Sequence, residues 1–148
     1  MRTLCKVCIL VPQFAYYPDS SCGTTTLSID SSTPTVFKSP NYDDATPNYP
    51  NLLSCQWQFT AAPVDQLILV EFNSMDTEYG YDYVYVGSVT GVGPIARMFA
   101  YSGSTTPGLV WLSPANVVTI AMDTDDDNND IDYQGFQVTL TVVSAGGK

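Results

Sequence analysis

Apolar and polar residues alternate with a period of two along several short stretches of this 148-residue chain. The alternation is clearest at 55–59, 118–122 and 136–142. Successive side chains of a β-strand point to opposite faces of its sheet, so each such stretch predicts a strand with one apolar face. No long segment repeats with the helical period of 3.6 residues, and the sequence therefore predicts an all-β chain.

Clusters of Pro, Gly, Asn, Asp and Ser separate the predicted strands. The Ser- and Thr-rich stretch 24–35 is a segment of low complexity, and both O-linked sugars and a plain exposed loop would explain it. Short strands with one apolar face each need a second sheet to cover that face, which predicts a jelly-roll-like β-sandwich of two sheets. The predicted strands are 35–38, 54–60, 67–72, 83–87, 95–101, 109–112, 117–122 and 136–143.

The composition indicates one folded domain with an acidic surface. Hydrophobic residues make up 45% of the chain and charged residues only 14%, which argues against disorder. A chain of this length folds around a single core. Its net charge of -10 repels phosphate backbones and anionic lipids, so nucleic acid is not an expected partner. A membrane-spanning helix would need about 20 consecutive apolar residues, and the sequence has no such run.

Catalytic chemistry finds little support in the sequence. The chain contains no histidine, which excludes a nucleophile activated by a histidine base. Cys5 and Cys8 form a C-x-x-C motif, but neither a second such motif nor a histidine completes a zinc site. A local bridge, a pair of buried thiols and a link to another chain all remain open for these two cysteines. We expect the protein not to be an enzyme.

The first 21 residues combine Arg2 and Lys6 with a short apolar run. That run suggests a secretion signal but is shorter than the usual hydrophobic region of one. We therefore expect residues 4–11 to form a β-strand, which pairs either with its own sheet or with a neighbouring copy of the chain.

An acidic segment near the C-terminus holds six aspartates between Asp123 and Asp132. Carboxylates at this density repel one another unless solvent or a cation relieves the repulsion. The segment lacks the residue order of an EF-hand, so a metal would have to be held jointly with other loops. A solvated acidic loop without any metal is the alternative.

A series of short motifs resembles the CUB domain, an extracellular β-sandwich module used for binding. The resemblance covers residues 22–144, with 1–21 as an N-terminal extension and 145–148 as a short tail. In chain order, the motifs are Cys22-Gly23, Ser39-Pro40-Asn41-Tyr42, Asn48-Tyr49-Pro50-Asn51, Cys55-Gln56-Trp57, Tyr81-Asp82-Tyr83, Ser113-Pro114-Ala115-Asn116 and Gly135-Phe136.

The resemblance implies a disulfide between Cys22 and Cys55 and hence an oxidising compartment. The second disulfide of the family has no counterpart, because Tyr79 or Gly80 stands at one of its positions and 99–103 contains no cysteine. Trp57, beside the first bridge, is expected to pack in the core.

The resemblance also implies a calcium site. The acidic residues that bind calcium in some members of the family correspond in this chain to Glu78, Asp82 and Asp125. Asn128 or a nearby carbonyl would complete the all-oxygen shell that Ca²⁺ requires. The resemblance also places Tyr42 or Tyr49 close enough to hydrogen-bond the glutamate. Residues that could substitute as ligands are Asp76, Asp123, Asp126 and Asp127.

These observations predict a secreted, calcium-stabilised module that binds a protein through Lys or Arg, or a carbohydrate, at its acidic end. A second hypothesis is a subunit of an extracellular filament or matrix that assembles through residues 4–11 by strand addition. A third is a fragment of a larger protease or receptor.

Overall fold

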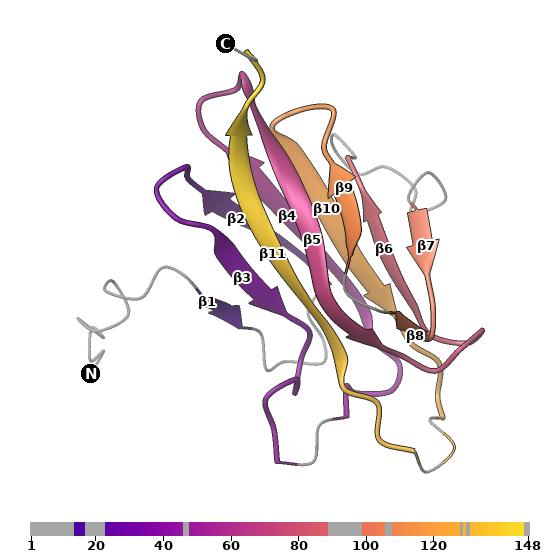
Figure 1. Ribbon diagram of the computed structural model, residues 1–148. Coiled ribbons are helices and arrows are strands. Elements are labelled where there is room, and N and C mark those ends of the chain that lie inside the picture. The colour runs from indigo at the N-terminus through magenta and orange to yellow at the C-terminus, as the bar shows by residue number, and fades with distance from the viewer. Residues whose placement is uncertain are drawn as a thin grey trace, which may run out of the picture.

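Two β-sheets packed face to face form the protein, as the computed structural model shows (Figure 1). The structure describes residues 14–16, 23–45, 48–88, 99–105, 108–127, 129 and 131–146. Every regular element within these ranges is a strand. The predicted all-β sandwich is therefore confirmed.

The first sheet has six strands, in the order β1-β3-β11-β5-β8, with β9 also paired to β5. Its pairs are antiparallel except β1 with β3, which run parallel. Its strands are β1 (Phe14–Tyr16), β3 (Thr35–Lys38), β5 (Gln66–Asp76), β8 (Ser104–Thr105), β9 (Leu109–Leu112) and β11 (Gly135–Ser144).

The second sheet has five strands, in the order β2-β4-β10-β6-β7. Its pairs are antiparallel except β2 with β4. The antiparallel neighbours β6 and β10 meet at one end of the sandwich, where β6 begins and β10 ends. The strands of this sheet are β2 (Gly23–Ile29), β4 (Ser54–Ala61), β6 (Tyr83–Gly87), β7 (Phe99–Tyr101) and β10 (Val117–Asp123).

The core lies between the sheets and is built from the alternating residues. Trp57 is fully buried, and its ring centroid lies 5.0 Å from that of Phe37 and 5.9 Å from that of Phe136. Phe37 also meets Phe59 edge-to-face at 5.1 Å. These contacts favour aromatic packing over a ligand-stacking role for Trp57.

Seven of the predicted strands coincide with or lie inside β3, β4, β5, β6, β9, β10 and β11. The eighth, 95–101, is described only from residue 99, where β7 begins. The interpretation of 24–35 as a plain exposed loop is wrong, because the Thr-rich segment forms β2 through residue 29. Thr26 and Ser28 are exposed and Ile29 is buried, so β2 has a solvent face that polar residues suit.

The strand predicted at residues 4–11 lies outside the described residues, and so do Cys5, Cys8 and Cys22. Farther along the chain, β1 pairs in parallel with β3 and extends one edge of the first sheet. Within the part of the chain that the structure describes, no helix has the length and hydropathy needed to cross a bilayer.

Candidate functional site

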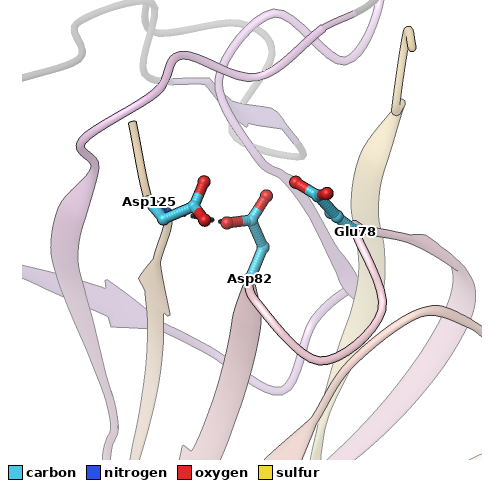
Figure 2. A group of neighbouring side chains, drawn as sticks. All are labelled: Glu78, Asp82 and Asp125. Atoms are coloured by element: carbon cyan, nitrogen blue, oxygen red, sulfur yellow. Dashed lines mark hydrogen bonds between the residues drawn. The ribbon is translucent and has the colours of Figure 1, made fainter. Parts of the chain in front are cut away.

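Three carboxylates meet at the end of the sandwich where β6 begins and β10 ends. Asp82 directly precedes β6, and Asp125 follows β10 by two residues. Tyr83 pairs with Asp123 across these strands, which brings the two aspartates to the same end. Glu78 lies in the turn between β5 and β6, and one oxygen from each of the three carboxylates lies within 4.8 Å of the others. Figure 2 shows the three side chains together, with Asp82 between the other two.

Asp82 is fully buried at the centre of this acidic cluster, which we define as Glu78, Asp82 and Asp125. Its Oδ1 accepts a hydrogen bond from the Asp125 backbone N–H at 2.9 Å, and its Oδ2 accepts one from the Tyr49 hydroxyl at 2.5 Å. Burial raises the pKa of Asp82 despite these two hydrogen bonds. The fold thus holds this carboxylate in a place that disfavours its charge.

Tyr49 links two members of the cluster. Its hydroxyl donates to Asp82 and accepts a hydrogen bond from the Glu78 backbone N–H at 3.0 Å. Burial, and next the hydrogen bond to Asp82, raise the pKa of Tyr49, so the phenol keeps its proton. The sequence expectation therefore holds for Tyr49 through the glutamate backbone, whereas the Tyr42 hydroxyl lies 2.5 Å from Ser74 Oγ instead.

The ring of Tyr49 is fixed from both sides. It stacks on Tyr133 with ring centroids 6.4 Å apart. On another side lies Gly135, whose φ of 94° starts β11 close to the ring. A Cβ at Gly135 would lie 3.5 Å from Tyr49 Cδ1 and only 2.0 Å from Ser39 Oγ. Glycine at this position therefore allows the close approach of Ser39, whereas a Cβ would meet Tyr49 only at an ordinary contact distance.

Glu78 carries the atom that most needs a further partner. Its side chain is buried, and its Oε1 accepts a hydrogen bond from Asn129 Nδ2. Its Oε2 is also buried but has no hydrogen-bond partner. Leaving a buried carboxylate oxygen unsatisfied is costly, so the chemistry of this atom fits a bound cation.

The segment that carries Asp125 is attached to the loop before β4. The Leu52 N–H donates to the Asp125 carbonyl at 2.7 Å, and the Leu53 N–H donates to Thr124 Oγ1 at 2.8 Å. Thr124 Oγ1 in turn donates to the Pro50 carbonyl at 2.9 Å. Loops distant in sequence thus hold Asp125 in place.

Of the four predicted metal ligands, Glu78, Asp82 and Asp125 come together, and Asn128 lies outside the described residues. Its neighbour Asn129 reaches Glu78 instead, which sequence reasoning missed. Asn129 has a φ of 52°, and asparagine is among the residues that tolerate this left-handed conformation. An asparagine within the acidic segment was therefore the one sequence feature that could have indicated this contact.

The proposed substitute ligands do not join the cluster found within the described residues. Asp76 accepts hydrogen bonds from Ser104 Oγ at 2.6 Å and from the Gln134 N–H at 3.2 Å. Asp126 and Asp127 are exposed. Asp123 pairs with Tyr83 in the sheet and does not belong to the acidic cluster found within the described residues.

Basic residues are scarce around the acidic end. In the described ranges Lys38 is the one Lys or Arg, and its Nζ lies 2.7 Å from Asp43. Within those ranges, no basic side chain of the protein itself offsets the charge of the acidic cluster.

Cys55 is disulfide-bonded and almost fully buried. The parallel register places Gly23 opposite Cys55. Cys22, the predicted partner, is the residue before Gly23 and lies outside the described residues, so the pairing stays a prediction.

Comparison with known proteins identifies a family and a relative that are similar to this chain. A family model described as the CUB domain matches residues 22–140. Mouse ovochymase-2 is 32% identical over 134 residues, which cover 87% of this chain but only 20% of the mouse protein. The chain thus spans about a fifth of that relative.

Solved structures share the fold. The full extracellular region of zebrafish Gpr126/Adgrg6 matches with a TM-score of 0.64 and 25% identity, over 84% of this chain and 15% of that one. The MASP-1 CUB2 domain bound to Ca²⁺ matches with a TM-score of 0.55 and 15% identity, over 82% of this chain and 98% of that one.

Proposed function

This chain belongs to the CUB domain family, and from that premise we propose that it is an extracellular interaction module whose acidic end holds a calcium ion and binds a basic group of a protein partner. CUB domains are interaction modules found in extracellular proteases and receptors, and they are generally non-catalytic. The observation that carries the proposal is the unpartnered, buried Oε2 of Glu78 inside a cluster of three carboxylates.

A divalent cation suits the acidic cluster on physical grounds. Glu78 and Asp82 are both at least nine-tenths buried, and one oxygen of each lies within 4.8 Å of the other and of Asp125. Like charges this close repel strongly in a medium of low dielectric constant. Oxygen ligands favour Ca²⁺, which takes six to eight of them at about 2.3–2.6 Å in a flexible shell. The calcium-bound MASP-1 CUB2 domain, which has this fold, supports the same assignment.

Within such a site, Glu78, Asp82 and Asp125 would hold the ion, and Tyr49 would orient Asp82 through its hydroxyl. Asn129 donates a hydrogen bond to Glu78 and so brings the acidic segment next to the cluster, from which a further oxygen ligand would come. The ion would neutralise most of the charge that the fold has buried.

A basic group is the partner chemistry that the remaining charge favours. Three carboxylates exceed the charge of one Ca²⁺, and the described residues supply no basic side chain to balance the excess. A Lys or Arg of a partner would form charge-assisted hydrogen bonds with oxygens whose positions the ion has fixed. The excess negative charge of the cluster favours a basic protein group over a carbohydrate, and the filament hypothesis depends on residues 4–11, which lie outside the described residues.

Calcium titration with a melting-temperature readout tests the ion. We expect Ca²⁺ to raise the melting temperature above that in EDTA, and Mg²⁺ at the same concentration to raise it less, because Mg²⁺ demands near-octahedral geometry and gives up its water reluctantly. Asp126→Asn is a matched control, since it removes one exposed carboxylate from the same segment. An equal melting temperature with calcium and with EDTA would reject the ion.

A further inference from the structure

Leu52, beside the acidic cluster, combines two unusual properties. Its side chain is 73% exposed, and its backbone has a φ of 58°. The other described non-glycine residues with positive φ are Asn41 and Asn129, and asparagine tolerates this region. For a bulky residue such as leucine the left-handed conformation is strained.

The surrounding loops impose this conformation. The Leu52 N–H donates to the Asp125 carbonyl, the Leu53 N–H donates to Thr124 Oγ1, and the Thr124 N–H donates to the Leu53 carbonyl at 3.0 Å. Leu53 is buried in the core. The backbone at residue 52 is therefore fixed by its neighbours, while the Leu52 side chain is left largely in solvent.

Stability does not explain a leucine at this position. An exposed side chain gains little from burial, and glycine or asparagine would fit the backbone with less strain. Strained residues of this kind concentrate at binding and catalytic sites. The 2.7 Å hydrogen bond from Leu52 to the Asp125 carbonyl places its backbone directly against a residue of the acidic cluster.

We infer that Leu52 is an apolar contact residue for the partner, and that the partner segment carries a large apolar side chain next to the Lys or Arg that reaches the acidic cluster. This inference rests on the proposed function, because it assigns the basic group to the same site. The occupant is thus a basic and apolar protein segment. Contact with it would bury a leucine side chain that the free protein leaves exposed, an effect worth about tenfold or more in affinity.

A randomised peptide display library, selected on the full chain with calcium and then with EDTA, tests the inference. We expect calcium-dependent binders that carry Lys or Arg beside a large apolar residue. Leu52→Gly should weaken the selected peptide about tenfold and should yield binders that remain basic but lose the apolar preference. Val64→Gly is the control, because Val64 is 83% exposed in the turn between β4 and β5, at the opposite end of the sandwich.

The melting temperature separates binding from folding. Glycine adopts positive φ readily, so Leu52→Gly should keep or raise the melting temperature while affinity falls. Basic, calcium-dependent binders that bind Leu52→Gly as tightly as the wild type would overturn the role of Leu52 and leave the proposed function standing. Binders without basic residues, binders insensitive to EDTA, or no binders at all would overturn both.

Discussion

Replacing Glu78 by glutamine should stabilise the protein without calcium and remove most of the stability that calcium adds. Glutamine keeps the shape of the side chain and an oxygen for the Asn129 amide, but it removes a buried charge whose Oε2 has no partner. Without metal, relief of that unsatisfied group should stabilise the fold by about 1–3 kcal/mol. The new amide N–H would also face the carboxylates of Asp82 and Asp125.

With calcium, the same substitution removes a ligand. Extracellular calcium modules bind with dissociation constants of about 10⁻⁴–10⁻³ M, so about 10 mM calcium reaches up to about 100 times that constant. Across that range of dissociation constants, calcium at about 10 mM stabilises the wild type by about 1.4–2.7 kcal/mol. A domain of this size gains about 2–4 °C per kcal/mol, which predicts a calcium shift of roughly 3–11 °C. Glu78→Gln should lose most of that shift.

Differential scanning calorimetry in EDTA and in calcium measures both effects, with Asp126→Asn as the charge-matched control. We expect Glu78→Gln to melt above the wild type in EDTA and to gain little from calcium, while Asp126→Asn follows the wild type in both. The reasoning fails if Glu78→Gln is less stable than the wild type in EDTA and still shows the full calcium shift.

Three further predictions concern the surroundings of the cluster. Burial raises the pKa of Asp82 above its unfolded value, so the native state binds this proton more tightly than the unfolded chain does. In EDTA the contribution of Asp82 to stability should therefore fall as the pH rises above about 4, whereas calcium should reverse the trend; equal slopes in melting temperature would contradict this. Tyr49→Phe keeps the ring but removes hydrogen bonds to Asp82 and to the Glu78 N–H, and should cost about 1–3 kcal/mol in urea unfolding and weaken calcium binding; an unchanged midpoint would argue against it. Peptide mapping without reduction should join Cys55 to Cys22, and loss of that bridge should cost about 2–5 kcal/mol; a bridge from Cys55 to another cysteine would refute the pairing.

The sandwich was predictable from the sequence because apolar residues at alternate positions of the strands form its inner faces. Trp57, Ile120 and Val138 lie on different strands, and each is fully buried, as its alternation predicts. β2 was missed because its threonines occupy both faces, so the segment has no contrast between apolar and polar positions. Its strand conformation comes from parallel pairing with β4, a contact distant in sequence.

The candidate site likewise contains residues that the sequence predicts and residues that only the structure reveals. The identities of Glu78, Asp82 and Asp125 follow from motifs in the chain, and the structure brings their carboxylates together. Asn129 and Leu52 could not be assigned from the sequence, because their importance arises from backbone conformation and from hydrogen bonds between separate loops. Such contacts depend on how loops distant in sequence pack together, and no short sequence motif predicts that packing.

The ladder between β6 and β10 runs up to Tyr83 and Asp123, one residue from Asp82 and two from Asp125. Calcium therefore has little chain left to order and almost no apolar surface to enclose. Because apolar burial governs heat capacity, ion uptake should leave the heat capacity of the protein nearly constant even while its melting point moves. Isothermal calorimetry at several temperatures would then give an enthalpy that hardly changes, as expected of a rigid socket rather than of a segment that folds around its ion.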